Sequence, residues 1–104
     1  MSAVSTLDAY QHSAARTVNS ALTDDEQLRD AACGLAEEAG EVLAHVRKHV
    51  MQGRTLDRDA VTEELGDALW CIAIVARSVG VTLGAVAEQN LDKLRARHPE
   101  GLRA

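Results

Sequence analysis

The chain has few aromatic residues and almost no proline. Its 104 residues include no Phe, one Trp (Trp70), one Tyr (Tyr10) and one Pro (Pro99). A core of aromatic and β-branched strands is therefore not expected, whereas a hydrophobic content of 46%, mostly Ala, Leu and Val, favours closely packed helices. Because proline is confined to the C-terminal end, the rest of the chain can form uninterrupted helices. The length predicts a single domain over residues 1–104.

Long apolar segments and an excess of positive charge are also missing. The longest apolar run covers residues 68–76, whereas a membrane span needs about 20 residues. Residues 1–10 lack the basic and apolar regions of a signal peptide. The net charge is -5, whereas proteins that bind nucleic acid polymers normally carry a basic patch. We therefore expect a cytoplasmic protein that binds neither a membrane nor a nucleic acid polymer.

Cysteine is scarce as well. The two cysteines, Cys33 and Cys71, both fall within apolar helical patterns. Cytosolic proteins keep their thiols reduced, and a free cysteine packs as a small apolar residue. We therefore predict two reduced core thiols and no disulfide.

Apolar residues recur at helical spacing in four segments, and residues typical of helix termini flank them. Ser5 and Thr6 precede the first segment, Thr23 with the acids after it precedes the second, and Thr82 precedes the fourth. Gly80 is expected to end the third segment. The expected helices cover residues 6–20, residues 24–51, a segment from Asp57 or Asp59 to residue 79, and residues 83–97.

Four helices with short connections predict an all-α fold of the four-helix bundle type. The second and third helices are long and closely connected, so they are expected to pair antiparallel. A chain of this length buries only roughly 65% of the surface that its unfolded form exposes. We therefore expect an oligomer that associates through a remaining apolar face.

Two pairs of acids stand beside apolar residues on the second and third helices. Glu38 and Glu41 form one pair, and Glu64 and Asp67 form the other, each with the i,i+3 spacing that shares a helix face. Both pairs fall at matching positions at the margin of the apolar stripe. If the helices pair antiparallel, four carboxylates face one another and repel unless some of them take up protons or a cation lies among them. Because these are oxygen ligands, Mg²⁺ is the first candidate.

A competing metal group lies on the second helix alone. Glu41, His45 and His49 follow one another at intervals of four residues, a spacing at which two histidines can bind a transition metal. However, the Glu-x-x-His motif of di-iron bundles is absent. Histidines near a helix C-terminus also suit the helix dipole. We favour the interpretation that His45 and His49 are partly exposed residues near a helix end.

The acid motifs and their flanking residues resemble a known family. The segment GLAEEAGEV (residues 34–42), followed by EELGDALW (residues 63–70), resembles the MazG-like nucleotide pyrophosphohydrolases of the all-α NTP pyrophosphohydrolase superfamily. Residues 10–17 resemble the first helix of small members, and NLDKLRAR (residues 90–97) with the following Pro-x-Gly resembles the C-terminal motif. The family signature is EExxE, a spacer and ExxD, which is formed here by Glu37, Glu38, Glu41, Glu64 and Asp67.

The resemblance implies an Mg²⁺-dependent hydrolase that converts nucleoside triphosphates to monophosphates and pyrophosphate. Clearing of non-canonical nucleotides and control of a normal pool both stay open as its role. Small members form homodimers or homotetramers in which neighbouring subunits share the cleft. The implied residue roles are metal ligation by Glu38, Glu41, Glu64 and Asp67, proton transfer by Glu41 or Glu37, and phosphate or sugar contact by Asn90, Lys93 and Arg97. Lys48 is a weaker phosphate candidate, and Trp70 is expected either in the base pocket or in packing.

A function of a different class is a non-enzymatic helical module that mediates oligomerisation. In that case the acids would be solvated or would specify a bundle interface. Asp67 argues against this alternative, because an interface has little reason to place an acid beside Cys71 and Ile74.

Overall fold

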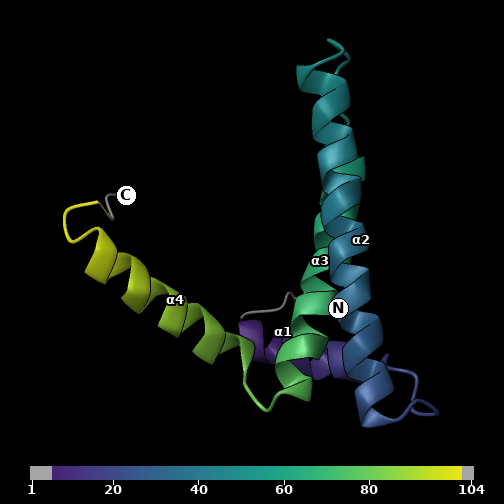
Figure 1. Cartoon of the computed structure of the whole chain (residues 1–104), viewed down its shortest axis with the longest axis vertical. Helices are drawn as coiled ribbons and strands as arrows, with labels where there is room; N and C mark the ends of the chain where they lie inside the picture. The colour runs from purple at the N-terminus through teal and green to yellow at the C-terminus, as the bar shows by residue number, and fades with distance from the viewer. Residues whose placement is uncertain (1–5, 102–104) are drawn as a thin grey trace.

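The computed structural model describes residues 6–101, which form four α-helices and no strand (Figure 1). The all-α fold class is therefore confirmed. The Ser5 start signal lies outside the described residues. The helices are α1 (Leu7–Ala15), α2 (Asp24–Val50), α3 (Arg58–Ser78) and α4 (Leu83–Arg97).

Each helix begins at a side chain that caps its first turn. The Oγ1 atoms of Thr6, Thr23 and Thr82 accept hydrogen bonds from backbone N–H groups three residues later, as does Oδ1 of Asp57. Thr23 and Glu26 form a complete capping box, so both orphan N–H groups are satisfied. The predicted starts of these helices are confirmed.

The predicted end of the first helix is wrong. α1 ends at Ala15 rather than at residue 20. Beyond that point the Thr17 hydroxyl donates to the carbonyl of Ala14, and Asn19 Oδ1 accepts from the N–H of Ala21. Such local side-chain bonds compete with helix hydrogen bonding, so residues 16–22 form turns instead.

α2 and α3 form a long antiparallel hairpin, which is the largest helix contact in the described chain. The two helices approach closely at Gly34, where a Cβ atom would lie 2.9 Å from Cys71 Sγ. Cys71 is buried, but Cys33 is exposed, so the prediction of two core thiols is wrong for Cys33. The reason is that α2 packs against α3 alone, which leaves the side of α2 that carries Cys33 in solvent.

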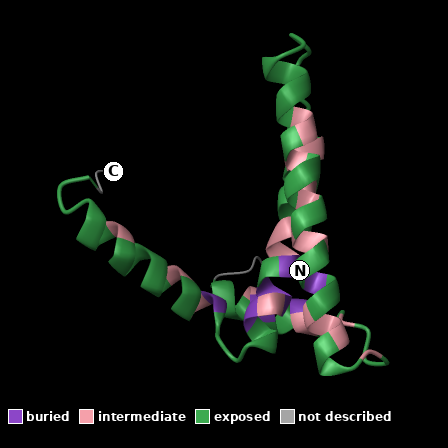
Figure 2. Cartoon of the chain, in the orientation of Figure 1, coloured by how far each residue is buried: buried purple, intermediate pink, exposed green. Residues whose placement is uncertain are grey.

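The core is small and lies where α1, the end of α3 and the start of α4 meet (Figure 2). It consists largely of alanines. Ile74, the largest fully buried side chain of the described residues, lies on α3 outside this cluster. Tyr10 and Trp70 pack against its edge. We call this region the junction; its buried cluster is Ala14, Ala73, Ala76 and Leu83.

Gln11 is a buried polar latch within the junction. Its Nε2 donates to the carbonyls of Ala73 and Val81, both at 3.1 Å, and its Oε1 accepts from the N–H of Leu83. Asp8 adds a bond from the N–H of Gly84 at 2.7 Å. Together these bonds fix the loop after α3, so that α4 leaves the hairpin at 97° to α3.

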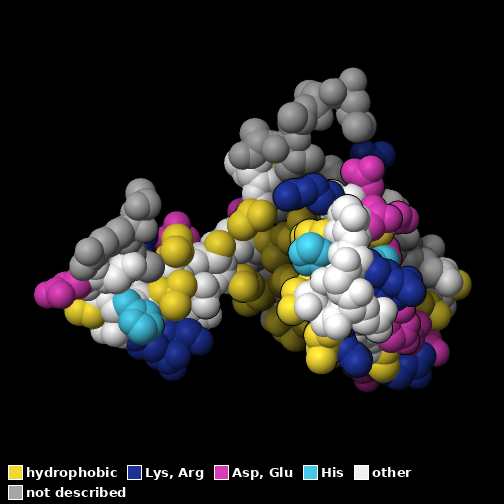
Figure 3. Space-filling model, turned by 90° about the horizontal axis from the view of Figure 1, so that it is seen from above, with side chains coloured by type: hydrophobic (Ala, Val, Ile, Leu, Met, Phe, Trp, Pro, Cys, Tyr) yellow, Lys and Arg dark blue, Asp and Glu magenta, His cyan; other side chains and the backbone are white. Residues whose placement is uncertain are grey.

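Much of the molecule outside the junction is exposed. α4 contacts only α1 and α3, and Leu83 is its one buried residue. On the distal half of the hairpin, Leu43 is 55% exposed, Val50 70% and Leu65 53%. Figure 3 shows hydrophobic side chains open to solvent on both arms. A single copy of the chain therefore leaves two apolar surfaces uncovered.

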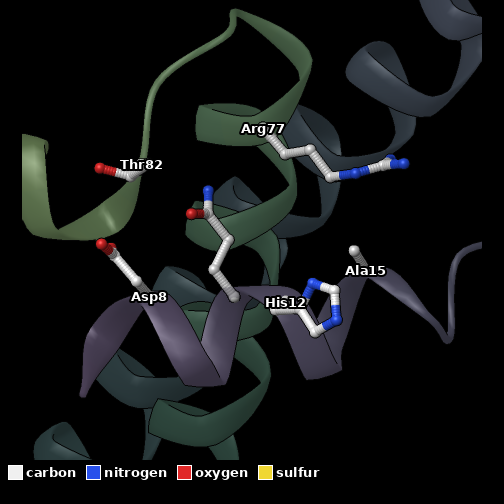
Figure 4. Close-up of a pocket in the computed structure, with 6 residues that line it drawn as sticks. Asp8, His12, Ala15, Arg77 and Thr82 are labelled. Atoms are coloured by element: carbon white, nitrogen blue, oxygen red, sulfur yellow. The ribbon is translucent and has the colours of Figure 1, made fainter.

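A cavity lies beside the latch (Figure 4). Its lining includes Asp8 and Thr82 on one side and His12 and Arg77 on the other. It lies on α1 and the end of α3, away from the acid pairs.

Within residues 6–101 no single helix is long and apolar enough to cross a membrane; the bent pair of α3 and α4 meets the criterion only by length and composition.

Candidate metal and nucleotide site

The α2–α3 hairpin brings carboxylates from both helices together. One ligand atom from each of Glu38, Glu64 and Asp67 lies within 4.8 Å of the other two. Glu38 and Glu64 are half-buried and Asp67 is exposed. Because Glu64 and Asp67 are one turn apart on α3 and Glu38 faces them from α2, the antiparallel pairing creates this carboxylate group. It could not form on either helix alone.

The surroundings of Glu38 within this group disfavour its ionised form. Its pKa is raised from 4.5 to about 7, first by hydrogen bonding with the Glu64 carboxyl group, then by desolvation and by the charges of Glu64, Asp67 and Glu41. Among the described side chains, Glu38 Oε2 is a buried oxygen atom that has no hydrogen-bond partner. A buried oxygen without a partner is costly in an apolar setting. A cation at this position would supply the missing partner, so these residues fit a hard divalent ion such as Mg²⁺.

A second group lies one turn further along α2. Ligand atoms of Glu41, His45 and Glu64 also lie within 4.8 Å of one another, and Glu64 belongs to both groups. His45 is half-buried, whereas Glu41 is exposed. The spacing on α2 alone did not show that Glu64 would join these two residues, because that contact depends on how α3 pairs with α2.

His49 belongs to neither group. Its Nδ1 lies 2.6 Å from the carbonyl oxygen of Arg54, so the ring is engaged at the end of α2. The three-residue set Glu41, His45 and His49 is therefore not formed. His45 is half-buried and His49 is exposed, so neither is a core residue, in line with the prediction, but His45 also lies beside Glu64 of α3.

Burial and the negative charge of the site raise the pKa of two weakly acidic groups. The pKa of the Cys71 thiol is raised by burial and then by the charges of Glu38, Asp67 and Glu37. The pKa of Tyr10 is raised by burial and then by Asp67 and Cys71. The carboxylates thus extend their field from the hairpin to α1, and both groups stay neutral at physiological pH.

Two further residues expected on the hairpin lie outside these groups. Glu37 is exposed on α2 and contributes to neither set of three. Lys48 is exposed near the distal end of α2. Both face solvent beside the site rather than within it.

Trp70 lies one turn beyond Asp67 on α3 and is half-buried. Its Nε1 donates to Thr17 Oγ1 at 2.8 Å. It lines a cavity between α2, α3 and the turn after α1, together with Asn19, Gln27 and Asp30. Trp70 therefore packs against the junction and borders a hollow whose lining includes none of the carboxylates of the two groups.

Asn90, Lys93 and Arg97 are not brought to the carboxylates of the same chain. All three lie on α4, which projects from the junction and does not contact α2 (Figure 1). Asn90 and Lys93 border an open hollow on α4 itself, with Val86 and Gln89. One chain thus holds the acidic and basic parts of the expected site on separate arms.

Comparisons with known proteins identify the family of the chain. The family model of the MazG nucleotide pyrophosphohydrolase domain matches residues 27–102. The chain is also similar to the "Gene 37 protein" of Mycobacterium phage L5, at 35% identity over 81 residues, which is 74% of this chain and 71% of the phage protein. No solved structure matches. The match covers α2 from Gln27 onward, α3 and α4, and with them the acids of both groups, so the chain belongs to the MazG nucleotide pyrophosphohydrolase domain family.

Proposed function

We propose that this protein is an Mg²⁺-dependent nucleoside triphosphate pyrophosphohydrolase. The observation that carries the proposal is the carboxylate group of Glu38, Glu64 and Asp67, with its buried, unpartnered Glu38 oxygen, in a chain of the MazG family. In the proposed reaction a water oxygen bonds to the α-phosphorus. The bond between the α-phosphorus and the oxygen that bridges it to the β-phosphate breaks, and the products are monophosphate and pyrophosphate. Mg²⁺, when bound, supplies charge neutralisation at the phosphate oxygens and acidifies a bound water.

The chain's own residues have three tasks in this proposal. Glu38, Glu41, Glu64 and Asp67 hold the cation and turn an acidic cleft into a phosphate site. Glu41 or Glu37 accepts the proton of the attacking water; Glu41 lies beside Glu64, whereas Glu37 is reached from the solvent side. Trp70, at the cavity one turn from Asp67, borders the base or sugar of the nucleotide.

We further propose that a homodimer or homotetramer completes the site. The apolar residues of α4 and of the distal hairpin are exposed in a single copy, and contact with a second copy would bury them. In such an assembly Asn90, Lys93 and Arg97 of one copy contact phosphate held by the carboxylates of another, with Lys48 nearby. Leu91→Asp on α4 is expected to lower the molecular mass measured by light scattering and to lower activity with it. A monomeric wild-type protein with full activity would refute the shared site.

The deciding experiment is incubation of the full chain with canonical and modified (deoxy)nucleoside triphosphates and Mg²⁺. We expect monophosphate and pyrophosphate as products, and activity is expected to be lost in Glu38→Gln and Asp67→Asn while the helical circular dichroism spectrum persists. Formation of diphosphate and orthophosphate would contradict the cleavage position. Absence of hydrolysis, combined with a melting temperature insensitive to Mg²⁺ and chelator, would favour the oligomerisation module instead. Relative rates across the panel distinguish clearing of non-canonical nucleotides from control of a normal pool.

A further inference from the structure

His45 differs from the other ligand candidates because it offers nitrogen. It shares a cluster with Glu41, one turn before it on α2, and with Glu64 across the hairpin, and the ligand atoms of all three lie within 4.8 Å of one another. The neighbouring group of Glu38, Glu64 and Asp67 offers oxygen only. Two cation positions of different chemistry thus lie side by side and meet at Glu64.

The imidazole of His45 is available for a cation, whereas that of His49 is not. Within residues 6–101, His45 forms no hydrogen bond and no ion pair, although it is half-buried on the side of α2 that faces α3. His49, one turn later, is held by the carbonyl of Arg54 at 2.6 Å. The two histidines therefore form a natural pair of test and control, with the same side chain one turn apart on one helix.

The donor set decides which ion each position prefers. Carboxylate oxygens suit hard ions such as Mg²⁺, and Mg²⁺ has little preference for nitrogen. Imidazole binds Co²⁺ and Zn²⁺ far better, and exchanging an oxygen ligand for nitrogen shifts selectivity toward these metals. Two cations that share a carboxylate are common in enzymes that act on phosphates.

We propose that Glu41, His45 and Glu64 form a second cation position, which prefers a divalent transition metal to Mg²⁺. The inference rests on the cation-binding carboxylates of the proposed function and adds a nitrogen ligand to them. The consequence is a protein whose two positions respond differently to the metals present. Mg²⁺ fills the oxygen-only position, whereas Co²⁺ fills the position at His45 first.

The test is a titration of the full, metal-free chain with Co²⁺ and, separately, with Mg²⁺, in the absence of nucleotide. Calorimetry gives both affinities, and the visible absorption of Co²⁺ reports nitrogen ligation. Removal of the imidazole in His45→Gln is expected to weaken Co²⁺ binding by about tenfold or more and to change Mg²⁺ binding by less than about twofold. His49→Gln is expected to leave both affinities and the spectrum unchanged.

Two results would overturn the inference: wild-type Co²⁺ affinity and spectrum in His45→Gln, or an equal loss of Co²⁺ and Mg²⁺ binding in that variant. His45→Glu, which restores an oxygen ligand, is expected to recover binding while losing the preference for Co²⁺ over Mg²⁺. This second variant keeps the question open to measurement if His45→Gln does not fold. The titration contains no nucleotide, so its outcome is separate from that of the hydrolysis assay. If the wild type hydrolyses nucleotides but its Co²⁺ affinity does not depend on His45, only the inference is refuted. Nitrogen-dependent Co²⁺ binding without any hydrolysis refutes the proposed function alone.

Discussion

The junction and the hairpin arm use polar residues in opposite ways. At the junction, the buried Gln11 amide forms three hydrogen bonds and leaves no polar atom unmatched. On the hairpin, Glu38 has a buried oxygen without a partner and a pKa raised to about 7. Buried polar groups that serve stability are normally satisfied, and this contrast is the reason that we propose a cation at Glu38 and none at Gln11.

The largest expected effect concerns the carboxylate shared by both cation positions. Glu64→Gln removes a ligand from each group, so we expect hydrolysis to fall by more than about a hundredfold, with a lower affinity for Mg²⁺. Glu63→Gln is the matched control, because Glu63 is adjacent in sequence but exposed and outside both groups. Rates measured from pyrophosphate release compare the two variants. Equal activity of Glu64→Gln and Glu63→Gln would show that the carboxylate groups of the hairpin do not carry the chemistry.

A core substitution on α3 is expected to affect stability rather than chemistry. Ile74 is 1% exposed, and Ile74→Ala leaves a cavity in the interior. The free energy of unfolding is expected to fall by about 2–5 kcal/mol, which urea denaturation measures. Ile72→Ala is the control on the same helix, since Ile72 is 37% exposed. If both variants lost the same stability, the core would not lie where the burial pattern places it.

The latch is expected to have a smaller effect that also reaches α4. Gln11→Leu keeps a similar side-chain volume but removes the amide group. The carbonyls of Ala73 and Val81 and the N–H of Leu83 then have no partner. We expect a loss of about 1–3 kcal/mol in the free energy of unfolding. Amide hydrogen exchange is expected to speed up at Leu83, the first residue of α4. His12→Gln, at the exposed neighbouring position, serves as the control, and unchanged exchange at Leu83 in Gln11→Leu would contradict the role of the latch.

The smallest expected effect is the pH dependence of the carboxylate group. Because the folded-state pKa of Glu38 is raised to about 7, its contribution to stability is fully present below pH 4.5 and is lost as the pH rises through about 7. Metal-free protein is therefore expected to lose melting temperature from pH 5 to pH 8. Over the same range Mg²⁺ binding, which needs the ionised carboxylate, strengthens by roughly tenfold between pH 6 and pH 8.

Glu38→Gln gives the control for this pH dependence. The variant lacks the titrating group, so its metal-free melting temperature is expected to vary less with pH than that of the wild type. Melting curves recorded with chelator at four pH values make the comparison. If the variant and the wild type had the same pH profile, another group would carry the dependence.

Local features of the sequence predicted much of the fold. The caps at Thr23, Asp57 and Thr82 and the stop at Gly80 act within one turn of the chain, so they can be identified without tertiary information. The end of α1 was missed because side-chain bonds of Thr17 and Asn19 replaced helix bonds there. The exposure of Cys33 was missed because helical periodicity indicates which residues share a face, but not whether another helix covers that face.

The sequence by itself determined the four helices, the family and the four acids at i,i+3 spacing, because each depends on neighbours in the chain. Only the tertiary structure decided which acids meet. The antiparallel pairing sets Glu38 against Glu64 and Asp67, joins His45 to Glu64, and leaves His49 on a carbonyl. It also decided that the latch turns α4 away from the hairpin and so separates the basic residues of α4 from the carboxylates. These contacts span large sequence separations, and their geometry is set by helix packing, which residue spacing alone does not contain.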